Sequence, residues 1–183
     1  MLTQKDEKIY YYVLYVTAGK EEDICRIISN CLCNDIYEPF TFKKITSFER
    51  GKVIRRVTRV IFPGYVFIKT CLTESDFFIK MICFVRNTNH IIRILNYGSN
   101  EKLAVEDDEI AFLLDLCNEK YCIEYSKGFI EGDKITVVEG PLMGQESKIR
   151  KINKQKRNAT IELIFMNEIR SVTIGLDCIK KAD

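Results

Sequence analysis

The pattern of apolar residues changes near residue 120 of this chain of 183 residues. Up to residue 118, segments with the two-residue period of strands alternate with segments that have the 3.6-residue period of helices. From residue 129 onward, only short strand-like runs bounded by turn residues remain. This change predicts two domains of unlike architecture, residues 1–118 and 129–183, joined by a linker at residues 119–128.

The first domain is expected to be an α/β sandwich of the α+β class, in which an antiparallel sheet is flanked by helices. Acidic residues open two of its helices, and Thr73-x-x-Asp76 resembles a capping box before a third. Pro63-Gly64 interrupts the longest strand segment. The predicted strands are 9–16, 40–48, 53–70 and 91–95, and the predicted helices are 20–32, 77–83 and 106–117.

The second domain is expected to be a small β-barrel. Turn signals such as Gly132-Asp133 and Gly140-Pro141 separate its apolar runs. The predicted strands are Lys134–Glu139, Glu146–Ile152, Thr160–Phe165 and Arg170–Ile174. A barrel of this size is only marginally stable alone.

Composition and motifs exclude several classes of protein. The chain has 28 Lys+Arg, 26 Asp+Glu and 46% apolar residues, which suits a folded soluble protein. It has no apolar run of about 18 residues and its N-terminus is charged, so we expect a cytoplasmic protein without a membrane anchor. Eight cysteines without a C-x-x-C pair predict free thiols and no metal site. His90 is the only imidazole and there is no phosphate-binding loop, so neither an enzyme nor a cofactor is expected.

A dense basic run lies in the second domain. Ten consecutive residues from Lys148 to Arg157 hold six cations and no acid. Lysine and arginine contacts to phosphates release counterions, and A-form RNA is recognised mostly through its shape and backbone. The run therefore predicts RNA binding, and the alternative is a solvated turn that keeps the domain soluble. The predicted RNA-binding residues are Lys148, Arg150, Lys151, Lys154, Lys156 and Arg157.

A second basic stretch lies on the predicted hairpin of the first domain. Because alternate strand residues face opposite ways, Arg55 and Arg59 share one face and Arg56 lies on the other. No single surface therefore collects all its cations, and nucleic-acid contact here stays a hypothesis. The cations are Lys43, Lys44, Arg50, Lys52, Arg55, Arg56 and Arg59.

Four motifs in order resemble the NusG family. Ile61–Phe67 contains Phe-Pro-Gly-Tyr, as in the N-terminal (NGN) domain of that family, and 131–144 resembles the start of its KOW domain. Tyr11–Leu14 followed by Ala18-Gly19 resembles the opening strand, and Val85–Thr88 matches a Val-Arg-Asn-Thr segment. The resemblance covers about residues 9–181 and implies an NGN domain followed by an SH3-like KOW barrel.

The resemblance implies a monomeric, non-catalytic transcription elongation factor that binds RNA polymerase. Family residues that match Phe62, Pro63, Gly64 and Tyr65 lie against the polymerase clamp helices, and Tyr12 is an expected neighbour. The alternative for Phe62 and Tyr65 is a place in the core.

Two other segments of the sequence match positions that contact partners in members of the family. Asn87 and Thr88 match positions that contact non-template DNA in some members. Ile164-Phe165 matches the KOW region that meets ribosomal protein S10, although an apolar pair in a strand is more often core.

Three departures from housekeeping NusG favour a specialised paralogue. Tyr11 stands where Trp is usual, Asn89-His90 replaces Pro-Gly, and the basic run is exceptional. The chain therefore resembles LoaP, an antitermination paralogue that binds an RNA hairpin, and RfaH as a second choice. The alternatives are a general NusG-type pausing or termination factor, and an RRM-like RNA-binding module built on Gly64–Ile68 with Tyr10–Tyr12 beside it.

Overall fold

The computed structural model describes residues 8–50, 53–96, 102–131 and 134–179. Within these ranges it has mixed α/β structure, with three α-helices and twelve strands. Contacts divide the chain into two compact units. The first comprises residues up to Thr41 together with Phe62–Glu106, and the second comprises Phe42–Ile61 and the residues from Asp107 onward. No helix in the described part of the chain is long and apolar enough to cross a membrane.

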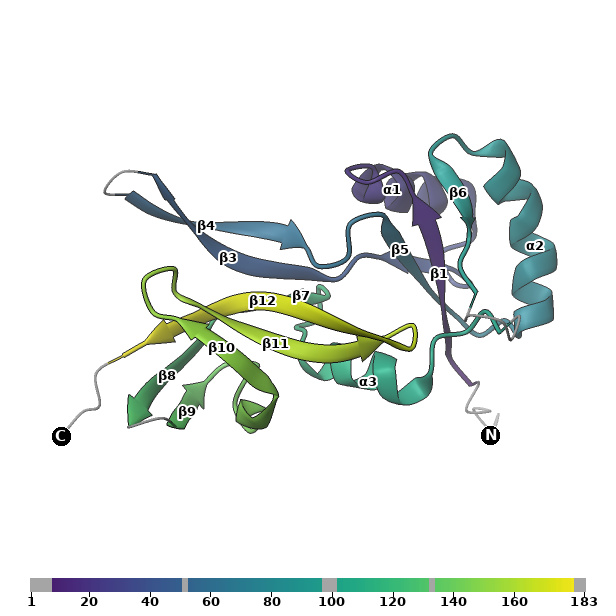
Figure 1. Ribbon diagram of the computed structural model, residues 1–183. Helices are drawn as coiled ribbons and strands as arrows, with labels where there is room; N and C mark the ends of the chain where they lie inside the picture. The colour runs from purple at the N-terminus through teal and green to yellow at the C-terminus, as the bar shows by residue number, and fades with distance from the viewer. Residues whose placement is uncertain (1–7, 51–52, 97–101, 132–133, 180–183) are drawn as a thin grey trace, which may run out of the picture. The chain divides into compact units, whose positions relative to one another are not determined.

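The first unit is a four-stranded antiparallel sheet with two helices, and Figure 1 shows β1, β5 and β6 beside α1 and α2. The strand order is β2-β5-β1-β6, so β1 and β5 are central. The elements are β1 (Tyr10–Val16), α1 (Glu21–Cys31), β2 (Glu38–Phe40), β5 (Tyr65–Thr70), α2 (Glu74–Asn87) and β6 (Ile91–Ile94).

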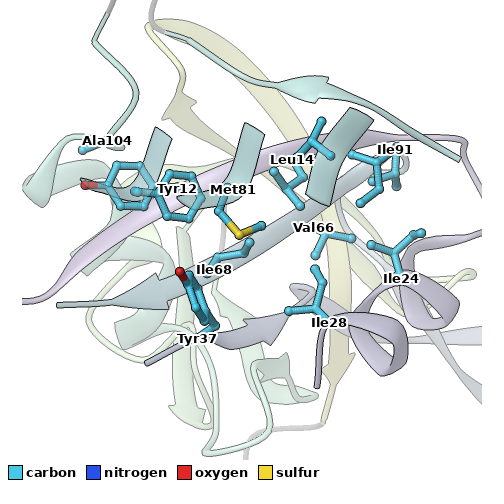
Figure 2. Close-up of a cluster of buried hydrophobic side chains, with 13 residues drawn as sticks. Tyr12, Leu14, Ile24, Ile28, Tyr37, Val66, Ile68, Met81, Ile91 and Ala104 are labelled. Carbon is cyan, nitrogen blue, oxygen red and sulfur yellow. The ribbon is translucent and has the colours of Figure 1, made fainter. Parts of the chain in front are cut away.

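Alternate residues of the central strands build the core of this unit. Tyr12, Leu14 and Val16 of β1 point to the same side as the β5 residues Val66 and Ile68, and all five are buried. The helices complete this cluster with side chains spaced three or four apart, which places them on one helix face. Figure 2 shows Tyr12, Leu14 and Met81 in the cluster. The helical members are Ile24, Ile28, Phe77, Met81 and Val85.

Thr73 caps helix α2 as the capping signal predicts, but the helix begins at Glu74, before the predicted residue 77, and ends later than expected. The Thr73 hydroxyl accepts a hydrogen bond from the Asp76 backbone N–H at 3.4 Å, which satisfies one of the unpaired donors of the first turn. The sequence predicted an end at Cys83, whereas the helix continues to Asn87. The reason is that Val85 extends the buried stripe by another turn.

The second unit contains two sheets and one α-helix. The sheet orders are β4-β3-β7 and β10-β11-β12-β8-β9, and Figure 1 shows β11 and β12 as a long hairpin. Most strand neighbours are antiparallel, while β3–β7 and β12–β8 are parallel. The elements are β3 (Lys43–Arg50), β4 (Val53–Val60), α3 (Asp107–Asp115), β7 (Cys122–Ile123), β8 (Ser126–Glu131), β9 (Lys134–Glu139), the 3-10 helix η1 (Glu146–Lys148), β10 (Ile149–Asn153), β11 (Asn158–Phe165) and β12 (Glu168–Cys178).

Strict alternation on β11 creates the core of the five-stranded sheet. Ala159, Ile161, Leu163 and Phe165 are buried, whereas the residues between them are partly or fully exposed. The predicted strand 134–139 coincides with β9. Residues 146–148, predicted as strand, form η1 instead, and the Glu146 carboxylate there accepts a hydrogen bond from the Val137 backbone N–H.

The two compact units divide the chain differently from the predicted domains. The β3–β4 hairpin and α3 cluster with the C-terminal strands, although both precede residue 119. The predicted linker contains β7 and the start of β8. Ser126 in this segment is fully buried and its hydroxyl accepts a hydrogen bond from the Leu142 backbone N–H at 3.0 Å. The domain boundaries at residues 118 and 129 stay a prediction.

Candidate functional site

The Pro63-Gly64 turn before β5 is fixed by backbone hydrogen bonds. Gly64 has φ +87°, which is costly for residues with a Cβ. A Cβ at this position would lie 3.1 Å from Cε2 of Tyr15 and 3.2 Å from the carbonyl oxygen of Val16. That close approach lets the Val16 backbone N–H donate to the Gly64 carbonyl oxygen at 2.7 Å. Glycine is therefore required here by both conformation and space.

The Glu21 side chain holds the same turn from helix α1. Its Oε1 accepts a hydrogen bond from the Gly64 backbone N–H at 2.6 Å, and its Oε2 accepts one from the Gly19 backbone N–H at 2.9 Å. Glu21 is only 4% exposed. The sequence indicated only a favourable acid in the first helical turn, because the partners of Glu21 depend on the tertiary fold.

Aromatic side chains surround this turn. The Tyr65 ring is partly buried, stacks on Phe62 with ring centroids 6.4 Å apart, and meets Tyr15 edge to face at 5.8 Å. Tyr15 is 37% exposed, Pro63 is exposed, and Phe62 is only 7% exposed. We call Tyr15, Pro63 and Tyr65 the aromatic surface. The buried Phe62 ring packs against Tyr65 and supports this surface. Tyr15 was not among the residues predicted from the sequence, although strand alternation places it on the opposite face of β1 from Tyr12.

Tyr12 belongs to the core, which corrects the expectation that it neighbours the binding surface. It lies on the opposite face of β1 from Tyr15 and is fully buried. Its ring stacks on Phe77 with centroids 3.9 Å apart, and its hydroxyl donates to the Leu72 carbonyl oxygen at 2.9 Å. Burial, followed by the nearby Glu74 carboxylate, raises the pKa of this hydroxyl.

The burial pattern disfavours the RRM-like alternative. β1 and β5 are neighbouring central strands, as that alternative requires. However, base stacking requires aromatic rings that are open to solvent, and both Phe67 and Tyr12 have no exposed surface.

Asn87 is the last residue of α2, and Thr88 is its C-cap at the start of the turn that leads to β6. The Asn87 amide donates to the Cys83 carbonyl oxygen at 2.9 Å, and the Thr88 hydroxyl donates to that of Phe84 at 2.7 Å. Both bonds run from a side chain to the carbonyl four residues earlier, in the last turns of α2. The Asn87 amide and the Thr88 hydroxyl therefore each donate one bond to the helix end.

The six cations of the basic run are all exposed, and they fall into two groups. In the first group, the Lys148 ammonium lies 5.5 Å from the centre of the Phe112 ring, Arg150 pairs with Glu162 at 2.8 Å, and Arg157 pairs with Asp177 at 3.8 Å. The second group is Lys151, Lys154 and Lys156, which form no salt bridge with any residue that the structure describes. Local carboxylates thus neutralise only part of the run.

The basic residues of the β3–β4 hairpin divide between its faces, as the alternation predicted. Lys44 lies directly opposite Arg59 on one face, and burial together with Arg59 lowers the pKa of Lys44. Arg56 lies on the other face, 3.3 Å from a carboxylate oxygen of Asp177. The side chains of Arg50 and Lys52 lie outside the described residues.

The apolar residues Ile164 and Phe165 lie on opposite faces of β11. Phe165 is fully buried, whereas Ile164 is 56% exposed and lies opposite Ile169, which is 74% exposed. These two isoleucines line a cavity of about 360 Å³ together with Phe112 of α3. Glu109 of α3 accepts hydrogen bonds from the Met166 and Asn167 backbone N–H groups of the adjoining turn.

All eight cysteines lie in the described residues. All eight cysteines are free thiols. No group of three or more His, Cys, Asp or Glu side chains in the described ranges is arranged to hold a metal ion.

Comparison with known proteins identifies relatives along most of the chain. Residues 9–114 match the family model described as transcription termination factor NusG. The chain is 22% identical over 179 residues to the transcription termination/antitermination protein NusG of Rickettsia typhi, covering 94% of this chain and 90% of that protein. It is 22% identical over 183 residues to the protein of the same name from Thermus thermophilus, covering 95% and 99%. A solved structure described as "Domain interaction in Thermotoga maritima NusG" matches with a TM-score of 0.49 and 18% identity, covering 92% and 94% of the two chains.

Proposed function

Because this chain belongs to the NusG family of transcription factors, we propose that it binds RNA polymerase during elongation and acts as a termination or antitermination factor without catalysing a reaction itself. The observation that carries this proposal is the family match over residues 9–114, which include the complete aromatic surface. The relatives named as termination/antitermination proteins align with most of the chain and support the same assignment.

We assign polymerase binding to the aromatic surface, with the clamp helices as its partner. Partly exposed tyrosines provide a large contact area with little side-chain entropy to lose. The bonds from Glu21 and Val16 hold the turn at Gly64 in one conformation, so docking requires little reordering. Phe62 contributes by supporting Tyr65 from beneath and not by direct contact.

We assign RNA binding to the basic run. Lys151, Lys154 and Lys156 are exposed on β10 and the turn that follows it. Three phosphate contacts on a duplex would give a slope of log affinity against log salt of about −2.7. An RNA hairpin is the proposed ligand because its A-form stem presents backbone and shape more than readable base edges.

The finer proposal is a specialised antitermination paralogue of the LoaP type. It is supported by Tyr11 in place of Trp, by Asn89-His90 in place of Pro-Gly, and by the basic run. The exposed pair Ile164 and Ile169 suits a protein partner, for which we propose ribosomal protein S10.

Binding to purified RNA polymerase tests the proposed function. We expect the wild-type chain to co-elute with polymerase, and we expect Tyr15→Ala with Tyr65→Ala to abolish co-elution. Phe78→Ala on α2 is the matched control, because Phe78 is 44% exposed and lies outside the aromatic surface. Undiminished binding of the double variant would contradict the assignment of the surface.

A further inference from the structure

One carboxylate joins two arginines that are far apart in the sequence. The Oδ2 of Asp177 lies 3.3 Å from a terminal nitrogen of Arg56, and its Oδ1 lies 3.8 Å from Nε of Arg157. Arg56 belongs to the β3–β4 hairpin and Arg157 to the turn that ends the basic run. The Asp177 side chain is 19% exposed, whereas those of Arg56 and Arg157 are 60% and 50% exposed.

Two more contacts join the same segments. The Arg56 guanidinium lies over the Tyr125 ring, 4.5 Å from its centre. The Ser47 hydroxyl donates to the Lys156 carbonyl oxygen at 2.7 Å. Both contacts lie within the second compact unit, so the hairpin and the turn after β10 form one local surface.

The arrangement suits phosphate binding better than charge neutralisation. A guanidinium has five N–H donors in a planar fork, so a bond to Asp177 leaves Arg56 with donors for another ligand. Asp177 contacts the guanidinium at one terminal nitrogen and the Tyr125 ring lies under it, and both contacts favour an ordered guanidinium, which lowers the entropy lost when a phosphate binds. Arg56 and Arg157 contact the Asp177 carboxylate, and the exposed Lys154 and Lys156 stand in the same turn as Arg157, so this surface has four cations and one carboxylate. The net charge remains strongly positive.

We propose that Arg56, Lys154, Lys156 and Arg157, oriented by Asp177, form one binding site for the phosphate backbone of an RNA stem. We call these five residues the seam. This inference rests on the proposed RNA binding and extends it to the β3–β4 hairpin. Arginine forks match phosphate oxygens bidentately, and contacts of this kind recognise the backbone without reading base edges.

A matched pair of arginine variants tests the seam in the full chain. Arg55 is exposed and adjacent to Arg56 on β4, but its side chain is on the opposite face. The probe is a fluorescent RNA hairpin with a stem of about 16 base pairs, titrated by anisotropy at several salt concentrations. Arg56→Gln should weaken binding about fivefold at physiological salt and reduce the salt slope by about 0.9, because one phosphate contact is lost. Arg55→Gln should change neither value.

Three outcomes would overturn the seam. One is an equal loss for Arg55→Gln and Arg56→Gln, which would indicate only a diffuse effect of charge. Another is unchanged binding by Arg56→Gln while Lys154→Gln with Lys156→Gln weakens it, which would leave the proposed RNA binding intact. The third is equal affinity for a DNA duplex of the same sequence, which would reject A-form RNA as the ligand. If the double lysine variant also binds normally, the proposed RNA binding itself fails.

Asp177→Asn separates orientation from charge. Removing a carboxylate from a basic surface should tighten RNA binding if only net charge matters. The seam instead predicts binding no tighter than wild type, because Arg56 and Arg157 lose the group that orients them. A severalfold gain in affinity would overturn the positioning role of Asp177. Thermal unfolding of the same samples reports whether the variant remains folded.

Discussion

The Oε1 atom of Glu21 accepts a hydrogen bond from the backbone N–H of Gly64 at a distance of 2.6 Å. This bond crosses from the first turn of α1 to the turn that precedes β5, and Glu21 also accepts from the Gly19 backbone N–H. A buried carboxylate therefore fixes the backbone next to Tyr65 and Pro63. The conformation of the aromatic surface depends on a residue that does not belong to it.

Replacing Glu21 should loosen this turn. Glu21→Ala leaves the buried Gly64 N–H without its carboxylate acceptor, which should cost roughly 1–3 kcal/mol. The Gly19 N–H also loses its acceptor, but Gly19 is exposed and water can replace that bond at little cost. Glu21→Gln keeps one acceptor oxygen and should cost less. Urea unfolding measures the free energies. Equal stability of Glu21→Ala and wild type would show that the bonds to Glu21 do not hold the turn.

Tyr12 and Tyr15 lie on opposite faces of β1, so their replacement by alanine should destabilise the chain by different amounts. Tyr12→Ala removes a fully buried ring and should destabilise the chain by about 3–5 kcal/mol. Tyr15→Ala removes a partly exposed ring and should cost much less. Denaturant midpoints of the two variants test this order. A larger loss for Tyr15→Ala would mean that the register of β1 is wrong.

Three lysines should account for much of the salt dependence of RNA binding. Gln at positions Lys151, Lys154 and Lys156 should reduce the slope of log affinity against log salt by about 2.7. The control carries the same change of charge at Lys80, Lys120 and Lys134, which are exposed elsewhere. Anisotropy titrations measure both slopes. Similar slopes for the two triple variants would assign the basic run to solubility.

Thiol reactivity tests the packing of the second unit. Burial, followed by Cys122, raises the pKa of Cys117 to about 12, and burial raises that of Cys122 as well. At pH 8 both thiols should therefore stay protonated and react slowly with iodoacetamide. Cys31, Cys33, Cys71 and Cys83 are exposed and should be alkylated first. Mass spectrometry of a time course gives the order, and early modification of Cys117 would contradict the packing described for it.

Local patterns predicted most elements because short-range physics determines them. The Thr73 cap, the acidic start of α1 and the alternation that forms β9 depend on neighbouring residues alone. The end of α2 was predicted too early, since the packing that continues through Val85 is tertiary.

The candidate sites were less predictable because they combine distant residues. Glu21 is 43 residues from Gly64, and Arg56 is 121 residues from Asp177. No pattern in the sequence joins either pair. Tyr12 and Tyr15 show the same limit at short range: alternation places them on opposite faces, but the tertiary packing decides that Tyr12 is buried and Tyr15 is 37% exposed.

Transcription in vitro across an intrinsic terminator tests the central claim most directly. The measurement is the fraction of transcripts that pass the terminator, with purified polymerase alone, with the wild-type chain, and with the Tyr15→Ala, Tyr65→Ala double variant. A factor that binds elongating polymerase through the aromatic surface should change that fraction, and the double variant should restore the value for polymerase alone. An unchanged fraction with the wild-type chain, or an equal effect of the double variant, would contradict the account.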